Sequence, residues 1–226
     1  MSSALPLTLV VNYPVFDRIL KNGKILSKGQ LTKLGISFQQ HTTSYVSLEH
    51  ALGTFDDVTL FIDPLFRSDL YGGHFNLGPR IIFDREVLYQ EGVFMLPTDQ
   101  GAYYDGLADR PRPRFQNFEN NKMKSREEKD RFIARMNIDS IIGSENPLIF
   151  ESVPCPEVHV PREIALSMAR AYLIHADFVE RYRQKPELQG KPVIPFFGKN
   201  GTLSPPDSLS LLQAYKEYLR LVEMQI

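Results

Sequence analysis

Short apolar runs of strand length recur along the chain as far as residue 160, and most of them end at Gly, Asp or Pro. Runs of this length and composition are typical of β-strands. A parallel sheet built from βαβ units would need a helix after each strand, and the spacing between most of these runs is too short for one. The sequence therefore predicts an α+β fold. The predicted strands cover residues 7–13, 36–38, 45–48, 58–62, 80–83, 92–96, 147–153 and 158–160.

Helices are predicted where apolar residues follow a 3.6-residue period or where capping residues flank a charged segment. Pro14 opens a short helix that Asn22-Gly23 ends, and residues 49–55 form one or two helical turns. Ser125 is a candidate N-cap for a charged helix at 125–136. Longer helices are expected at residues 162–183 and 207–223. Residues 101–116, with two prolines, are expected to form a long surface loop.

Length and composition limit the kind of protein this can be. The 226 residues contain no linker or repeat, which favours one domain over 1–226. With 26 Lys plus Arg against 27 Asp plus Glu, no global charge attracts nucleic acid or membranes, and the lone Cys155 excludes an intrachain disulfide. The N-terminus lacks a basic region, and no apolar run approaches the roughly 18 residues of a membrane span. We expect a soluble, cytoplasmic protein without a Sec-type signal.

The common dinucleotide, P-loop, serine-hydrolase and zinc-protease motifs are absent. What remains is an order of short elements: a helix ending in KNGKIL, then GISF, YVSLEHAL, VTLFID, RIIFDREVL and finally FESVPCPEVHVP. This order resembles the ADP-ribosyltransferase fold over roughly residues 9 to 161, and in particular the small toxin-like transferases that include the DarT-type DNA modifiers. The resemblance implies a split, mostly antiparallel β core at 7–161, with residues 162–226 as a helical part packed on it.

The resemblance also implies a set of site residues and NAD as the cofactor. Glu151, in the E-x-x-V-P context, matches the catalytic carboxylate of the family, and Ser47 matches the serine of the strand that shapes the nicotinamide pocket. Tyr45 is a candidate for stacking on nicotinamide. The first strand of the family supplies an Arg or His, whereas here it ends in Asn12-Tyr13, so Tyr13 and His41 are further candidates for cofactor contact. Ile149 lies two residues before Glu151, where the arginine-directed E-x-E transferases have an acidic residue. The resemblance therefore does not extend to those transferases.

The chemistry explains why so few polar groups suffice. Cleavage of the bond between nicotinamide and ribose passes through an oxocarbenium-like state, which a fixed carboxylate stabilises. Such a carboxylate works best when it is partly desolvated and held on a rigid strand. Glu151 between Phe150 and Val153 fits this description, and it fits equally an outward-facing residue of an edge strand.

The polar loop predicted at residues 101–116 carries the candidate target-binding residues. Tyr103 and Tyr104 can form a lid or a target-binding surface, and Arg110, Arg112 and Arg114 can bind phosphates. A solvated, extended loop explains the same residues. We expect a macromolecular acceptor, with nucleic acid slightly favoured over protein, and an antitoxin or inhibitor protein is a candidate partner.

Two other function classes remain open. Asp63, Asp84 and Glu86 follow predicted strands and could bind Mg²⁺ in a metal-dependent nuclease, although no histidine or carboxylate set has clear metal-ligand spacing. The missing basic residue of the first strand equally suits a non-catalytic binding or structural protein on a transferase-like scaffold. A rise in melting temperature with NAD is expected only for the transferase, and a rise with Mg²⁺ only for the nuclease.

Overall fold

The computed structural model describes residues 5–36, 43–63, 78–98, 104–105, 112–113, 115–138, 155–198 and 208–223. The strands are β1 (Leu7–Val10), β2 (Lys24–Leu26), β3 (Asp57–Ile62), β4 (Arg80–Phe83), β5 (Phe94–Leu96), β6 (Tyr104–Asp105), β7 (Arg112–Pro113), β8 (Glu157–Pro161), β9 (Glu163–Ala165), β10 (Ala169–His175) and β11 (Val193–Phe196). The α-helices are α1 (Tyr13–Asn22), α2 (Lys28–Lys33), α3 (Thr43–Leu52), α4 (Phe115–Asn121), α5 (Arg126–Met136), α7 (Ala176–Arg183) and α8 (Ser208–Glu223). Short 3₁₀ helices are η2 (Arg85–Tyr89), η5 (Leu166–Met168) and η6 (Pro186–Leu188).

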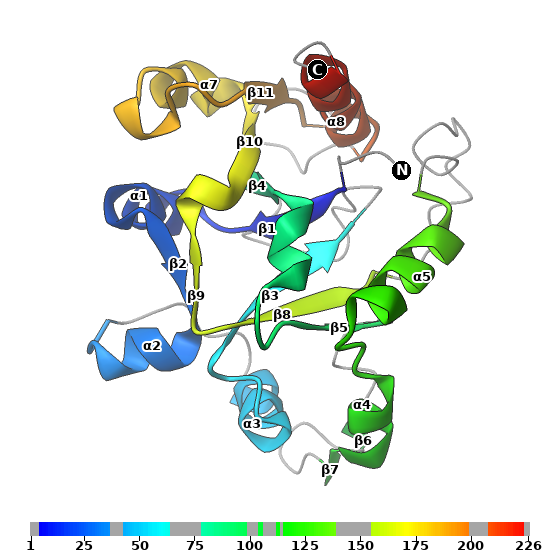
Figure 1. The fold of residues 1–226 in the computed structure, drawn as a ribbon. Helices are drawn as coiled ribbons and strands as arrows, with labels where there is room; N and C mark the ends of the chain where they lie inside the picture. Colours follow the sequence, from blue (N-terminus) through cyan, green and yellow to red (C-terminus); the bar gives the residue numbers. More distant parts are fainter. Residues whose placement is uncertain are drawn as a thin grey trace.

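A seven-stranded sheet in the order β11-β10-β4-β1-β3-β8-β5 forms the centre of the molecule (Figure 1). Its neighbouring strands pair antiparallel, except for the parallel pair β10 and β11. Two further pairs, β2 with β9 and β6 with β7, lie outside this sheet. The predicted α+β class with a mostly antiparallel β core is confirmed.

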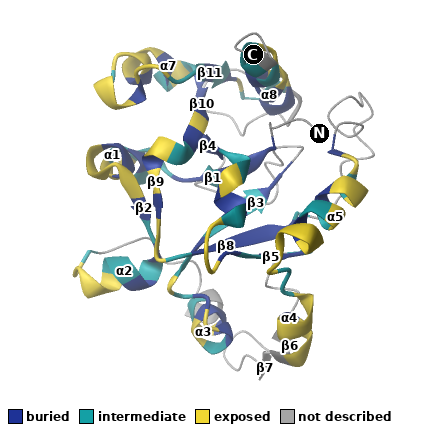
Figure 2. Ribbon diagram, viewed as in Figure 1, coloured by how far each residue is buried: buried dark blue, intermediate teal, exposed yellow. Residues whose placement is uncertain are grey.

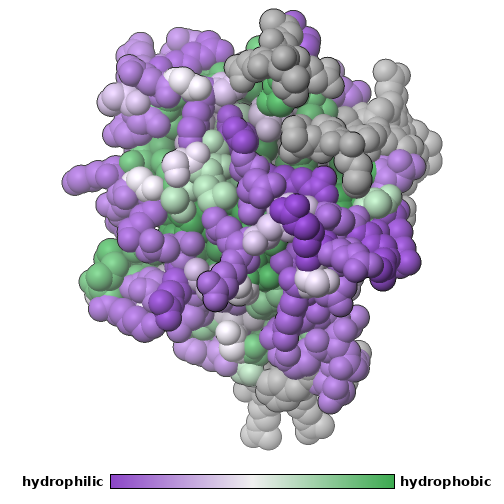
Figure 3. All heavy atoms as spheres, viewed as in Figure 1, coloured by the Kyte–Doolittle hydropathy of each residue, from purple (hydrophilic) through white to green (hydrophobic). Residues whose placement is uncertain are grey.

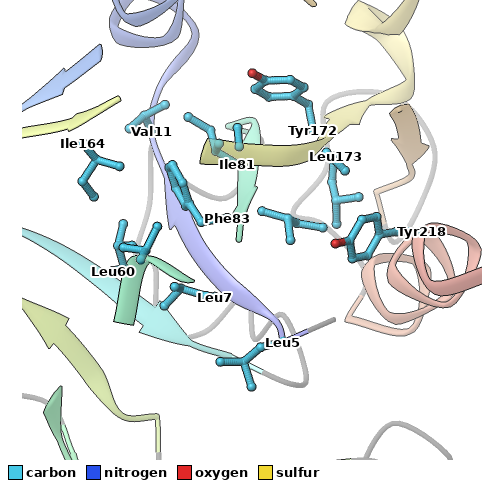
Figure 4. Close-up of a cluster of buried hydrophobic side chains, with 14 of the residues drawn as sticks. Leu5, Leu7, Val11, Leu60, Ile81, Phe83, Ile164, Tyr172, Leu173 and Tyr218 are labelled. Atoms are coloured by element: carbon cyan, nitrogen blue, oxygen red, sulfur yellow. The ribbon is translucent and has the colours of Figure 1, made fainter. Parts of the chain in front are cut away.

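One face of the large sheet is apolar and holds much of the core. The register aligns Leu7 with Ile62, Leu9 with Ile81 and Ile81 with Tyr172, and residues that pair across strands point to the same face. Leu7, Leu60 and Phe83 lie close together in the close-up of this core (Figure 4). Burying these side chains supplies the main stabilisation of the fold, at ~25 cal/mol per Å² of apolar surface.

Helices α1 and α7 cover the apolar face. The ring of Phe16 in α1 lies 5.7 Å from that of Tyr172 in β10 and 5.2 Å from that of Tyr182 in α7. Asn12 caps α1 by accepting a hydrogen bond from the Val15 N–H, and Gly23 ends it in the left-handed conformation that glycine tolerates. The strands are buried, the outward sides of the helices are exposed (Figure 2), and most of the face seen in Figure 3 is hydrophilic.

Several predicted elements are confirmed. The helix opened by Pro14 is α1, the charged helix is α5 with Ser125 as its N-cap, and the predicted C-terminal helix is α8. The runs at 58–62, 80–83, 92–96 and 158–160 contain β3, β4, β5 and β8. The loop predicted at 101–116 contains β6, β7 and the start of α4. The runs at 37–38 and 147–153 lie outside the described residues.

Two predictions were wrong. The long helix expected at residues 162–183 is replaced by β9, η5, β10 and only then α7. Arg162 has a φ of 66°, a left-handed conformation that no helix interior adopts, and it turns the chain from β8 into β9. The strand expected at 45–48 is instead part of α3, because Leu48 and Leu52, four residues apart, bury one side of a helix. The C-terminal part is consequently less helical than expected.

No helix in the described part of the chain is long and apolar enough to cross a membrane.

Candidate functional site

The face of the sheet opposite the apolar one carries its buried polar residues, and we call it the polar face. The register pairs Thr8 with Phe61 on one side and with Ile82 on the other. Phe61 in turn pairs with Glu157. Arg80 lies two residues before Ile82 on β4, so its side chain points to the same side as that of Ile82. All side chains in these paired positions therefore share one face. Its buried polar members are Thr8, Arg80, Glu157, His159 and His175.

Glu157 is the first residue of β8, and its side chain is fully buried. Its Oε2 lies 3.2 Å from Nε2 of His159, two residues along the strand and equally buried. Both residues sit on a strand that is paired on both sides, by β3 and by β5. Glu157 is therefore a dry carboxylate on a rigid element, in hydrogen-bond contact with an imidazole.

A second carboxylate lies on the other side of the imidazole. Oδ2 of Asp57, the first residue of β3, is 3.7 Å from Nδ1 of His159. Burial raises the pKa of Asp57, and the positive charges of His159 and Lys122 offset part of this rise. His159 thus lies between two acidic side chains, with Glu157 within hydrogen-bond distance of Nε2 and Asp57 farther from Nδ1.

Helices α2 and α3 bring another ion pair to this region. Nζ of Lys28 contacts both carboxylate oxygens of Glu49, at 2.5 and 2.6 Å, and Glu49 is buried. Burial raises the pKa of Glu49, whereas Lys28 and then His159 lower it. The electrostatic influence of His159 on Glu49 shows that the ion pair belongs to the surroundings of the imidazole.

Apolar side chains enclose the Glu157 and His159 pair. The ring of Phe94 in β5 stacks on His159 with centroids 4.6 Å apart and an interplanar angle of 6°. Leu96, which pairs with Glu157, clusters with Leu48 and Leu52 of α3 and with Phe118 of α4. These contacts keep bulk water away from the carboxylate and strengthen its electrostatic interactions.

Arg80 supplies a cation to the polar face at β4. It is fully buried, its Nη1 donates to the carbonyl oxygen of Gly78 at 2.8 Å, and its guanidinium lies 4.8 Å from the ring centroid of Phe196. Arg80 pairs with Val10 across the strands. The three strand spacings between β4 and β8 put it roughly 14 Å from the strand of Glu157.

His175 ends β10 close to Arg80, which begins the neighbouring strand β4; the register pairs Arg80 with Leu173. It is buried, and its Nε2 has no hydrogen-bond partner among the residues that the structure describes. Its Nδ1 accepts from the backbone N–H of Asp177 at 3.4 Å, which caps α7. Burial lowers the pKa of His175, Asp177 raises it and Arg80 lowers it further. The neutral imidazole is therefore favoured.

Thr8 lies near the middle of the polar face, next to Phe61. The side chain is 1% exposed, and within the described ranges no group hydrogen-bonds to its Oγ1. A buried hydroxyl without a partner costs folding free energy, so such groups mark positions where a ligand or water can bind. On the neighbouring strand, Thr59 and Phe61 remain half-buried, whereas Val58 and Leu60 on the apolar face are buried.

Tyr13 contacts α7 and the end of β10. Its ring lies 4.3 Å from that of Phe178 and 5.4 Å from that of Tyr182, both in α7. Its hydroxyl oxygen accepts a hydrogen bond from the backbone N–H of His175 at 3.2 Å. Burial raises the pKa of Tyr13. The residue joins α1 to α7, and its role toward a cofactor stays a prediction.

Ser47 and Tyr45 lie on α3 rather than on a strand, and Ser47 is exposed. α1, with Tyr13, and α3 lie well apart in Figure 1. The structure therefore does not group Tyr13 with Tyr45 and Ser47.

The other predicted site residues rest on segments that are described only in part. Glu151, His41, Tyr103, Arg110 and Arg114 lie outside the described residues. Tyr104 and Arg112 belong to the paired strands β6 and β7, and β7 packs against α3.

Three basic residues that follow the predicted target-binding loop all have acidic partners. Lys122 and Lys124 face Glu119 at 2.5 and 4.0 Å, and Arg126 faces Glu86 at 3.6 Å. Lys122 also lies over the rings of Phe94 and Phe118. These side chains contribute to local packing and ion pairing.

The carboxylates of the nuclease alternative have structural partners. Asp84 caps η2 and forms an ion pair with Arg170, and Glu86 pairs with Arg126. Asp63 is buried directly after β3. Within the described residues, no three His, Cys, Asp or Glu side chains gather as a metal site would require.

Sequence reasoning missed the buried pair Glu157 and His159. Both residues alternate with Val158 and Val160, a pattern that assigns polar and apolar residues to opposite faces of a strand. This alternation was a usable signal. It could not reveal that both faces of β8 are buried, which is what makes the carboxylate unusual.

Comparisons with known proteins identify the fold. No protein family model and no curated protein matches the chain. Among solved structures, Thermosipho africanus DarTG in complex with ADP-ribose aligns with a TM-score of 0.54 at 13% identity, covering 84% of this chain and 49% of that chain. This chain thus spans about half the length of that protein.

Two Thermus sp. 2.9 DarT structures also align. The complex with ADP-ribosylated ssDNA has a TM-score of 0.48 at 12% identity and covers 85% of this chain and 94% of that chain. The complex with carba-NAD+ has a TM-score of 0.47 at 13% identity, with coverages of 85% and 96%. The fold of this chain is that of the DarT-type ADP-ribosyltransferases.

Proposed function

We propose that this protein is an NAD-dependent ADP-ribosyltransferase that modifies a macromolecular target. The observation that carries the proposal is the fully buried carboxylate of Glu157 on the polar face of the sheet. The shared fold with a DarTG structure that binds ADP-ribose supports it, because ADP-ribose is the group that such an enzyme transfers.

Glu157 has the properties that the chemistry requires. Loss of nicotinamide leaves positive charge on the ribose, and a carboxylate fixed in a dry site stabilises that charge more strongly than one in water. Glu157 is held by a strand paired on both sides, so it needs little reorganisation when the charge develops. Glu151 remains the candidate that the family motif suggests, and the experiment below compares the two.

Two other polar-face residues are candidates for substrate contact. The hydroxyl of Thr8 is a buried group that a ribose hydroxyl can satisfy. The guanidinium of Arg80 suits the pyrophosphate of NAD, since arginine binds phosphate oxygens in a bidentate manner. Arg80 would thereby replace the basic residue that the first strand lacks. His41, Tyr45, Ser47 and Tyr13 stay as proposed contacts to the nicotinamide end.

The acceptor is proposed to be nucleic acid, with DNA first. Tyr103, Tyr104, Arg110, Arg112 and Arg114 are the proposed contacts, because aromatic rings stack on bases and arginines bind phosphates. A toxin role in the cytoplasm, with an antitoxin protein as partner, completes the proposal.

The test uses NAD labelled in its adenylate part. Wild-type protein is incubated with labelled NAD and a mixture of cellular nucleic acid and protein, and the label is followed into each fraction. We expect label in nucleic acid and loss of labelling in Glu157→Gln. Glu151→Gln makes the same chemical change at the motif-based candidate six residues away, so the two variants show which carboxylate the reaction needs. Label in neither fraction, with wild-type protein and intact NAD, would contradict the proposal.

A second candidate is a non-catalytic binding protein on the same scaffold. The observation in its favour is that β1 (Leu7–Val10) contains no charged residue, so the strand offers no Arg or His to a dinucleotide. Under this alternative, NAD or ADP-ribose raises the melting temperature without being consumed. NAD consumption by wild-type protein separates the two candidates.

A further inference from the structure

His159 has the environment of a residue that fixes another side chain. Its imidazole is fully buried, stacked on Phe94, and held between Glu157 on one ring nitrogen and Asp57 on the other. We propose that His159 is a positioning residue that orients the Glu157 carboxylate toward the reacting ribose, with Asp57 holding the imidazole in turn. This inference rests on the proposed function and adds a residue that its chemistry would depend on.

The first step of the argument is geometric. A carboxylate of glutamate has three side-chain torsions, and burial alone does not select one orientation. The contact of 3.2 Å between Nε2 of His159 and Oε2 of Glu157 occupies one carboxylate oxygen. Because the carboxylate group is rigid and planar, fixing one oxygen also fixes the direction in which the other oxygen points. A side chain fixed in this way provides the preorganisation that stabilises a developing charge.

The second step concerns the orientation of the imidazole itself. The ring of Phe94 lies parallel to it, at 4.6 Å and 6°, so the imidazole plane is set by packing. Oδ2 of Asp57 lies 3.7 Å from Nδ1, beyond hydrogen-bond distance, so Asp57 acts on the ring through its charge from the side opposite Glu157.

The third step is the charge balance around the ring. The groups that face His159 are Glu157 on its own strand, Asp57 on β3 and Glu49 on α3, with Lys28 of α2 paired to Glu49 and Lys122 acting on Asp57. Acidic groups therefore lie closest to the imidazole, and Nε2 is the ring nitrogen within hydrogen-bond distance of one of them, Glu157.

The test compares His159→Leu, which fills the space without a donor, with His159→Gln, whose amide N–H can still reach a carboxylate. We expect kcat for NAD cleavage to fall about 100-fold in His159→Leu and to recover in large part in His159→Gln, while KM for NAD changes by less than about threefold. The matched control is His50→Gln, an exposed histidine on α3 that stacks on Phe55.

The split between kcat and KM supplies a readout that a merely structural role would not move. A positioning role predicts that the loss in His159→Leu falls on kcat, while NAD raises the melting temperature of His159→Leu as much as that of wild-type protein. If His159→Leu does not fold, His159→Asn carries the test: its shorter amide cannot reach Glu157, so its kcat should lie well below that of His159→Gln.

Two outcomes would overturn the inference. One is a His159→Leu variant with the kcat of wild-type and of His50→Gln; the other is a His159→Gln variant whose kcat is no higher than that of His159→Leu or His159→Asn. These results are distinguishable from failure of the proposed function. If Glu157→Gln retains full NAD cleavage, the proposed function itself is wrong; if Glu157→Gln is inactive and His159→Leu is not impaired, only the positioning role fails.

Discussion

Replacing Thr8 by valine should make the protein more stable and its substrate binding weaker. The side chain is 1% exposed and its Oγ1 has no hydrogen-bond partner among the described residues. A buried hydroxyl of this kind costs about 1–3 kcal/mol, and valine has nearly the same shape without it. Valine also keeps the β-branched geometry that strands favour. We expect the free energy of unfolding to rise by about 1–2 kcal/mol.

The assay is urea unfolding of both proteins, read as a shift in the midpoint at constant slope. For a chain of this size, about 1–2 kcal/mol corresponds to a rise in melting temperature of roughly 2–8 °C. Thr59→Val is the matched control: Thr59 is half-buried on the same face, so water can satisfy its hydroxyl and its replacement should change stability by less than about 0.5 kcal/mol.

The functional half of the prediction uses the same variant. If the Thr8 hydroxyl contacts the ribose, Thr8→Val should weaken NAD binding about tenfold, equivalent to about 1.4 kcal/mol. A Thr8→Val protein that unfolds at a lower urea concentration than wild-type would refute the reasoning, because it would mean that the hydroxyl is satisfied and stabilising in the folded state.

Three further variants test other parts of the structure. Ser125→Ala removes the N-cap hydrogen bond from the Glu128 N–H to the Ser125 Oγ, while the backbone N–H of residue 125 can still donate to Glu128; it should cost about 1 kcal/mol, whereas Ser167→Ala, on an exposed serine, should be neutral in the same thermal melt. Lys129→Met removes two hydrogen bonds of 2.7 Å from a buried Nζ to backbone carbonyls and should cost about 2–3 kcal/mol by urea unfolding, with the exposed Lys124→Met as its control. Burial raises the pKa of Asp57 above 3.8, so its ionised form is less stable in the folded than in the unfolded state, and the associated stability is lost as pH rises through the folded pKa. The stability of Asp57→Asn relative to wild-type should therefore increase between about pH 4 and pH 7, and the opposite trend in urea unfolding would contradict this assignment.

The sequence was most informative where a local signal has a direct physical meaning. Gly23 ends α1 and Ser125 begins α5, because the left-handed C-cap and the side-chain N-cap are decided by the residues themselves. Five strands of the large sheet, β1, β3, β4, β5 and β8, overlap the predicted strand-length runs, whereas β10 and β11 do not. The order of these runs along the chain was sufficient to suggest the fold that the comparison with DarTG supports.

The errors arose where burial on two faces removes the periodic signal. Residues 171–175 of β10 are buried throughout, so their apolar pattern cannot separate a central strand from a buried helix. Tertiary context decides: β10 lies between β4 and β11 in the large sheet. In α3 the reverse holds: β-favouring residues near Val46 indicate a strand, whereas Leu48 and Leu52 bury one face of a helix.

The sequence predicted which type of residue the candidate site contains, but not its position along the chain. A late-strand glutamate beside apolar residues was expected, and Glu157 has that setting six residues after the motif-based candidate Glu151. The gathering of Thr8, Arg80, Glu157 and His159 on one face depends on strand register, which no single-chain pattern gives. Register is also what brings Asp57 to the far side of His159.

The rate of nicotinamide release from NAD by wild-type, Glu157→Gln and Glu151→Gln protein tests most directly whether the polar face is a ribosyl-transfer site. All three proteins should show the same rise in melting temperature with NAD, which establishes that they are folded and bind it. Wild-type and Glu151→Gln are expected to release nicotinamide at similar rates, whereas Glu157→Gln is expected to be at least about 100-fold slower. Undiminished release by Glu157→Gln would contradict the account.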